Sequence, residues 1–199
     1  MIQTMRKAAF LAAFFLFPVP GLAHAPIEGI DNFYNGLLHP VFVPAHLLLA
    51  IAVGLLIGQR GIVESRVAVG ICFLAIVLGL VMAWFVLGTG LEPYILASAA
   101  VIGLLVAANP AIGPAWYGMF AAAAGLLLGL DSPQETLSGK EKFVTLLGSG
   151  LGISLLVVYP MAMADYFKSQ AWQKIAVRIA GSWIAASSLL VLALTVSSI

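Results

Sequence analysis

The sequence predicts an all-α integral membrane protein, in which one bundle of six transmembrane helices follows a cleaved signal peptide. Three observations support this fold class. Of the 199 residues, 62% are hydrophobic and only 9% are charged, whereas a soluble domain has about 45–50% apolar and about 25% charged residues. Long apolar runs recur along the chain with short polar breaks between them. A basic pair near the N-terminus precedes a short apolar run, as in secretory signals.

The composition also excludes several classes of function. One soluble core could not bury this much apolar surface, which argues against a soluble enzyme, a disulfide scaffold or a disordered chain. Nine Lys and Arg against eight Asp and Glu leave no basic stripe, so nucleic acid is not an expected partner. Cys72 is the single cysteine, and it therefore says nothing about the redox compartment. The expected partner of most of the surface is the lipid bilayer.

Residues 1–23 have the pattern of a signal peptide. Arg6 and Lys7 precede the apolar run 8–17, which is too short to span a membrane comfortably, since a spanning helix needs about 20 residues. Cleavage is possible after Ala23 or Ala25, and a following proline disfavours the second cut. We therefore expect a mature domain of residues 24–199 that begins with His24. An uncleaved N-terminal anchor is the alternative.

Six apolar runs after the signal have approximately the length needed to cross about 30 Å of hydrocarbon. They cover residues 37–58, 67–88, 93–109, 113–130, 143–164 and 175–197. Positive charges stay on the cytoplasmic side of a membrane. The first and fifth breaks contain Arg60, Arg66, Lys168 and Lys174, whereas the second and fourth contain more acidic than basic residues. The charge distribution predicts that both mature termini lie in the periplasm, and we expect a multi-pass protein of the bacterial inner membrane.

Small residues recur at four-residue spacing in three of the predicted spans. Gly54 and Gly58 follow Ala50 in the first span, Gly148 and Gly152 lie in the fifth, and Ala121 and Gly125 in the fourth. Such stripes allow helix backbones to approach closely in lipid. We interpret them as packing surfaces.

The three histidines of the chain are all near its mature N-terminus. His39 lies near the outer mouth of the first predicted span, and His46 is about 10 Å deeper on an ideal helix and faces the same side. Pro44 between them predicts a kink that could bring the two rings closer together. An ionisable group inside a membrane marks a functional site by default, and neutral imidazole suits nickel, copper, zinc or iron. The structural alternative is that both rings only form hydrogen bonds between helices.

Residues 33–59 read FYNGLLHPVFVPAHLLLAIAVGLLIGQ. This segment resembles the first helix of the HupE/UreJ family of small membrane proteins, whose pattern is F-x-x-G-x-x-H-P followed by Asp-His-Leu-Leu and Ala-x-Gly. The residues that match this pattern are Phe33, Gly36, His39, Pro40, His46, Leu47, Leu48, Ala52 and Gly54. The resemblance also covers the signal peptide followed by histidine and the layout of six spans.

The sequence departs from the family pattern in both helices that carry its motifs. Ala45 stands where the first-helix motif has aspartate, and Val43 replaces its glycine. The fourth-helix motif of the family contains two histidines, but the corresponding stretch here, AAAAGLLLGLD, contains none. Asp131 falls where that motif has glutamate. One carboxylate and two imidazoles of the family's set are therefore missing.

The resemblance implies a permease that admits a divalent transition metal, most readily nickel, from the periplasm. The candidate metal ligands are His24, Glu28, Asp31, His39, His46 and Asp131, and a bound ion would be nickel, cobalt or copper. The sequence contains no ATP-binding P-loop, so the energy source would be a gradient or another subunit. The alternative is a non-transporting accessory or assembly subunit of a metalloenzyme complex. We do not expect an enzyme, although Ser149 between two glycines could be considered as a nucleophile with His46 as its base.

Overall fold

The computed structural model describes residues 30–61, 63–85, 90–132 and 137–197, and the predicted signal peptide lies outside them. Within these residues the fold is all-α, with no strand. Its helices are α2 (Asn32–Phe42), α3 (Pro44–Arg60), α4 (Arg66–Phe85), α5 (Glu92–Ala108), α6 (Pro114–Leu130), α7 (Gly139–Tyr166) and α8 (Ala171–Ser197). Each predicted span corresponds to one of these helices, except that the first is divided into α2 and α3.

Not every helix is long enough to cross a bilayer by itself. Helices α4, α7 and α8 have the length and composition of membrane spans, and α2 and α3 pass the same test as a bent pair. Helices α5 and α6 have 17 residues each and extend about 26 Å, slightly less than the hydrocarbon thickness of about 30 Å. The molecule is thus a helical bundle with membrane-like helices, and six crossings remain a prediction.

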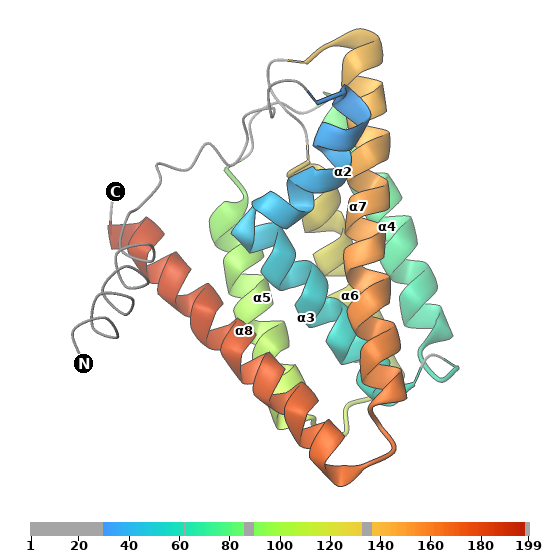
Figure 1. Cartoon of the computed structure of the whole chain (residues 1–199), viewed down its shortest axis with the longest axis vertical. Helices are drawn as coiled ribbons and strands as arrows, with labels where there is room; N and C mark the ends of the chain where they lie inside the picture. Colours follow the sequence, from blue (N-terminus) through green and yellow to red (C-terminus); the bar gives the residue numbers. More distant parts are fainter. Residues whose placement is uncertain (1–29, 62, 86–89, 133–136, 198–199) are drawn as a thin grey trace, which may run out of the picture.

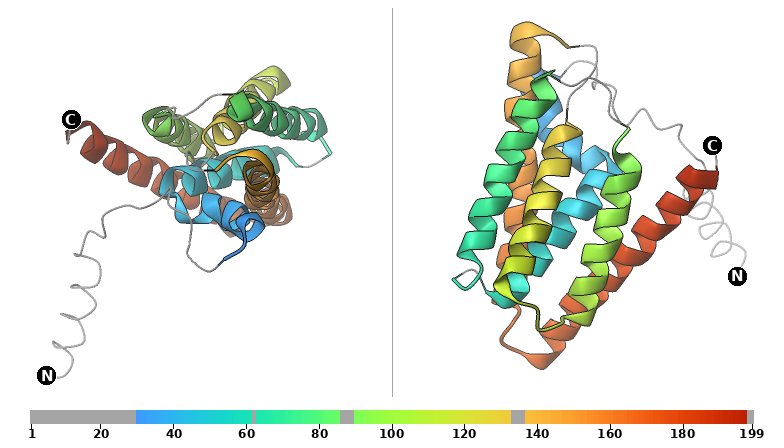
Figure 2. Two further views of the ribbon diagram at one scale, coloured as in Figure 1. Left: turned by 90° about the horizontal axis from the view of Figure 1, so that it is seen from above. Right: turned by 180° about the vertical axis from the view of Figure 1, so that it is seen from behind.

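The bundle is arranged around α3. Helix α3 packs against α7 and α5, α2 against the first half of α7, α4 against α6, and α8 against α5. From α3 onward successive helices run in alternating directions, and α8 crosses the others obliquely (Figures 1 and 2). The end of α3, the start of α4 and the junction between α7 and α8 therefore lie at one end, which we call the basic end because it carries Arg60, Arg66, Lys168 and Lys174.

The glycine stripes are close-packing surfaces, as predicted. A side chain at Gly54 or Gly58 would collide with the α7 backbone at Val157 or Met161. Gly148 and Gly152 face the α2 backbone in the same way. These contacts hold α2 and α3 against one face of α7, and this packing positions the site described below.

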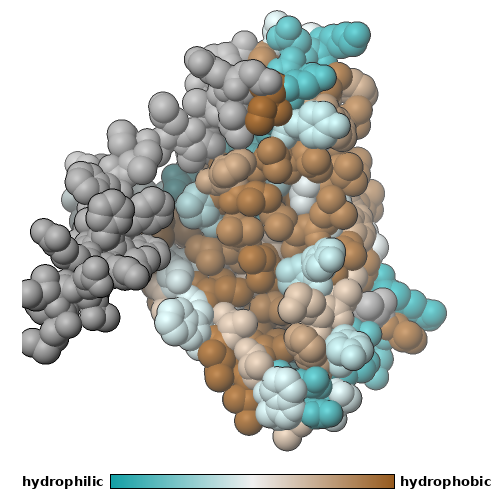
Figure 3. Space-filling model, viewed as in Figure 1, coloured by the Kyte–Doolittle hydropathy of each residue, from teal (hydrophilic) through white to brown (hydrophobic). Residues whose placement is uncertain are grey.

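The surface of the bundle is apolar between its two ends. Large side chains such as Leu74, Val77 and Leu190 are more than half exposed, and the space-filling view shows a continuous hydrophobic region with hydrophilic residues above and below it (Figure 3). Exposed apolar patches of this extent are atypical of soluble monomers. A lipid bilayer explains them.

Candidate functional site

The site is built on the break between α2 and α3. The two helices meet at Val43 with a bend of 74°. Pro44 is the first residue of α3, and Val43 before it is extended, with φ −91° and ψ 106°. Proline disfavours a helical conformation in the residue that precedes it, so the helix ends there and restarts in a new direction. The predicted kink is confirmed.

The bend brings the two histidines together. His39 in α2 is 5% exposed, His46 in α3 is fully buried, and their ring centroids lie 5.2 Å apart in an edge-to-face arrangement. On a straight helix the same residues would be separated by about 10 Å along the axis. The two rings therefore meet across the break, instead of sharing one face of a continuous helix as expected from their spacing.

Asp131 completes this group from the end of α6. It is the C-cap residue of that helix, and its Oδ2 lies 3.0 Å from His46 Nε2. The Asp131 side chain is 10% exposed, and the His46 side chain is inaccessible to solvent. A carboxylate 85 residues away in the sequence therefore faces the imidazole that the first-helix motif supplies.

This pairing determines the chemistry of the second nitrogen of His46. A carboxylate accepts hydrogen bonds, so Nε2 must carry the proton, and a neutral ring then has its lone pair on Nδ1. Nδ1 is buried and has no hydrogen-bond partner among the described residues. An unsatisfied buried polar atom costs about 1–3 kcal/mol. The site therefore contains an oriented nitrogen lone pair, on His46 Nδ1, that accepts no hydrogen bond from the described residues.

The remaining candidate ligands do not join this group. Asp31 is the exposed residue before α2, eight residues and about 12 Å along the helix from His39. His24 and Glu28 lie outside the described residues. In the described part of the chain, no three His, Cys, Asp or Glu side chains are arranged to hold a metal ion. The structure thus brings together His39, His46 and Asp131 without forming a complete coordination shell.

Polar residues of α2 and α7 near this group were not predicted as site residues. Asn35 and Thr145 are buried, and their side chains bond to the carbonyls of Ile30 and Glu141. Ser149 is fully buried, and its hydroxyl has no partner among the described residues. For Ser149, the Gly-Ser-Gly sequence favoured close packing over a role as a nucleophile. A sequence signal that could have identified Ser149 is its four-residue spacing from Thr145 and Ile153, which places all three on the buried side of α7.

Lys142 is a second residue whose position the sequence did not reveal. It was assigned to a polar break, but it lies in the first turn of α7, where it is 7% exposed. Its ammonium donates to the Trp84 carbonyl at 3.0 Å and lies 5.6 Å from the centre of the Trp84 ring. A cation is unfavourable at the N-terminus of its own helix. Here it is stabilised by the carbonyl and the aromatic ring of Trp84 at the end of α4.

The fold and the site together define the class of protein. It is a small helical-bundle membrane protein in which a broken helix buries a histidine pair, one member of which is oriented by a carboxylate.

The chain belongs to the HupE/UreJ family, because the family described as "HupE / UreJ protein" matches residues 12–191. The resemblance that we saw in the first helix is therefore confirmed over most of the chain. The family is generally associated with nickel and cobalt transport. Neither the curated proteins nor the solved structures that were compared gave a match to this chain.

Proposed function

We propose that this protein binds nickel at the α2–α3 break and admits it across the bacterial inner membrane from the periplasm. The observation that carries the proposal is the buried, unpartnered Nδ1 of His46. The Asp131 carboxylate orients this nitrogen, and the His39 ring lies 5.2 Å from the His46 ring. Nickel is the cargo, and no resident ion or catalytic activity is required.

The donor set supports a borderline transition metal over a hard cation. Imidazole nitrogen suits nickel, cobalt, copper or zinc, whereas magnesium and calcium prefer several oxygen ligands. Histidines that bind metals usually donate their other ring N–H to a carboxylate or carbonyl, which fixes the ring orientation. The pair formed by His46 and Asp131 has this arrangement. Two imidazoles with water as the remaining ligand suit a site that must also release its ion.

The basic end of the bundle supports the direction of entry. Arg60, Arg66, Lys168 and Lys174 all lie at this end, whereas His46 and Asp131 lie at the start of α3 and the end of α6, the helix ends that point away from it. The positive-inside rule assigns the basic end to the cytoplasm, so cargo would reach His39 and His46 from the periplasm. With six crossings and signal cleavage after Ala23, both mature termini are periplasmic. A C-terminal alkaline phosphatase fusion should then be active, and a green fluorescent protein fusion should be dark.

A second candidate function is a non-transporting accessory subunit of a metalloenzyme complex. It is favoured by the incomplete ligand group in the described residues and by the dry packing of α3 beyond its first turn. In this case the protein would bind an ion, or a partner subunit, without moving the ion through the bundle.

Nickel titration of the purified protein tests the binding step. His46→Gln keeps an amide that can donate to Asp131 but removes the nitrogen ligand, so it should fold and bind nickel at least about tenfold more weakly. His39→Ala should weaken binding less, and His24→Ala should have the smallest effect. Equal binding by the wild-type protein and His46→Gln would contradict a metal site at His46.

Nickel uptake into proteoliposomes separates the two functions. A permease should accumulate the ion in vesicles that contain the wild-type protein but not in those that contain His46→Gln. Binding without uptake would favour the accessory subunit. No binding and no uptake by a folded wild-type protein would contradict both roles of the site.

A further inference from the structure

A cavity lies at the basic end of the bundle, away from the histidines. Its volume is about 530 Å³, within the range of about 300–1,000 Å³ that is typical of small-molecule sites. The cavity opens between the first halves of α4 and α6. Apolar residues form most of its wall, namely Val67, Ala68, Ile71, Pro114, Met119 and Ala122.

The packing of α4 against α6 explains why this cavity exists. In the second half of α6, Gly125 and Gly129 lie directly against the backbone of α4 at Cys72 and Ile76. In its first half, a side chain at Gly118 would meet only the tip of Ile71, at 3.1 Å. The two helices therefore touch at one end and separate toward the basic end, which leaves a cleft with apolar walls.

Two opposite charges lie at the rim of the cleft. Arg60 donates to the Ile112 carbonyl, and its guanidinium is 4.7 Å from the centre of the Tyr117 ring. Glu64 is exposed on the same rim. In the described residues, no ion pair joins Glu64 to Arg60 or to another cation within 4.0 Å. Arg60 is thus held in place with further N–H donors, and a separate carboxylate faces the same opening.

We place the cleft at the depth of a lipid headgroup because exposed tryptophans lie at the same end of the bundle. Trp116 at the start of α6 and Trp172 at the start of α8 are more than half exposed at this end. Exposed tryptophan is enriched at the interface between membrane and water. The apolar walls extend from this interface toward the middle of the bundle, beside the exposed side chains of Val67 and Met119.

We propose that the cleft binds a zwitterionic phospholipid with a primary ammonium headgroup, of the phosphatidylethanolamine type. Arg60 takes the phosphate, Glu64 takes the ammonium, and the start of one acyl chain lies between α4 and α6. The charge pattern selects this class, because an anionic lipid would leave Glu64 without a cation and repel it. A quaternary ammonium would offer Glu64 no N–H donor.

Native mass spectrometry of the full chain in mild detergent tests this inference. The protein is incubated with equal amounts of phosphatidylethanolamine, phosphatidylcholine and phosphatidylglycerol that carry identical acyl chains. We expect the phosphatidylethanolamine adduct to exceed each of the others at least fivefold. Equal phosphatidylethanolamine and phosphatidylcholine adducts, a preference for phosphatidylglycerol, or no adduct at all would overturn the proposal.

Three variants locate the lipid. Glu64→Gln should reduce the phosphatidylethanolamine adduct to the level of phosphatidylcholine, and because this side chain is exposed the bundle should keep its fold. Ala122→Phe should fill the cleft and reduce all adducts. Glu141→Gln, an exposed carboxylate at the other end of the bundle, is the matched control and should bind like the wild type. Unchanged selectivity in Glu64→Gln with a folded protein would place the lipid elsewhere and overturn the assignment.

Discussion

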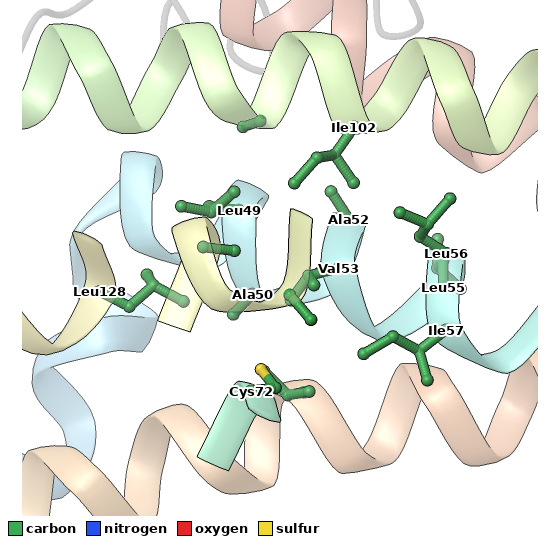
Figure 4. Close-up of a cluster of buried hydrophobic side chains, with 14 of the residues drawn as sticks. Leu49, Ala50, Ala52, Val53, Leu55, Leu56, Ile57, Cys72, Ile102 and Leu128 are labelled. Atoms are coloured by element: carbon green, nitrogen blue, oxygen red, sulfur yellow. The ribbon is translucent and has the colours of Figure 1, made fainter. Parts of the chain in front are cut away.

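The first turn of α3 and the rest of that helix differ sharply in chemistry. The first turn carries His46, which faces a histidine and a carboxylate from two other helices. From Leu49 to Gly58 every residue except Ile51 is buried, and none has a polar side chain. Figure 4 shows part of this layer, where Leu49, Val53 and Leu56 lie in one cluster with side chains from neighbouring helices.

This difference between the two parts of α3 would separate the binding of an ion from its movement through the bundle. A divalent ion could reach the first turn through polar groups, but further along α3 it would meet a dry apolar layer. Burying an ion without ligands is strongly unfavourable. Transport would therefore require α3 to shift against α5 or α7, whereas binding would not. In the proposed function the apolar layer would be the barrier, and the α2–α3 break would be the binding region.

The largest expected effect comes from disturbing the apolar layer at Gly58. A Cβ there would collide with the Met161 carbonyl and lie 2.8 Å from Ala164 Cβ. Because the obstacle is mainly backbone, Gly58→Leu should lower the free energy of unfolding by about 3 kcal/mol or more. Thermal unfolding in detergent measures the loss. Gly70→Leu is the matched control, since a Cβ at Gly70 meets nothing within 4 Å. Equal stability of the two variants would contradict the packing described here.

The next largest effect is expected from replacing Asp131, the carboxylate that faces His46. Asp131→Ala leaves the buried Nε2–H of His46 without an acceptor, which should cost about 1–3 kcal/mol in unfolding free energy. Asp131→Asn keeps an acceptor and should be more stable than Asp131→Ala. Both should weaken nickel binding about 10–100-fold, because the orienting carboxylate is absent. The exposed Glu141→Ala provides the control. Wild-type nickel affinity in Asp131→Asn would show that the carboxylate does not orient a ligand.

The sequence was sufficient to predict the helices and much of their packing. Apolar run length located the helices, Pro44 located the bend, and the spacing of Gly54 and Gly58 identified the face that meets α7. Each of these signals is local, since it depends on residues within a few turns of one another. The division of the first span into two helices bent by 74° goes beyond the predicted kink, because the angle depends on how α2 packs against α7.

The site was less predictable because its contacts join distant segments. Asp131 and His46 were both candidates, but no pattern indicated that they bond to each other across 85 residues. The position of Lys142 was also hidden, because its stabilising partner is the end of another helix. Hydropathy shows which segments are buried. It does not show which polar groups meet inside the bundle.

A smaller effect should follow from relaxing the break itself. Pro44→Ala allows Val43 to become helical, so some molecules would have a straighter α2–α3 segment with His39 farther from His46. If this shift costs about 1 kcal/mol, nickel affinity should fall about fivefold. Spin labels on α2 and α3 would report the change in angle. Pro93→Ala, near the start of α5, controls for the loss of a proline at a helix start. Unchanged angle and affinity would mean that packing on α7 alone maintains the bend.

The smallest expected effect compares two buried serines. Ser149 and Ser188 are both fully buried, and neither hydroxyl has a partner among the described residues. Replacing either with alanine removes an unsatisfied polar group, so both variants should be within about 1 kcal/mol of the wild type in stability, or slightly more stable.

The two serine variants should differ in nickel binding. Ser149 lies on the face of α7 that meets α2, one turn from Gly152, which faces Leu37 and Pro40. In the proposed site a hydroxyl there would hydrogen-bond to water carried by the ion, whereas Ser188 on α8 would not. Calorimetric titration should show a loss of about threefold or less in Ser149→Ala and none in Ser188→Ala, and an equal change in both would remove Ser149 from the binding region.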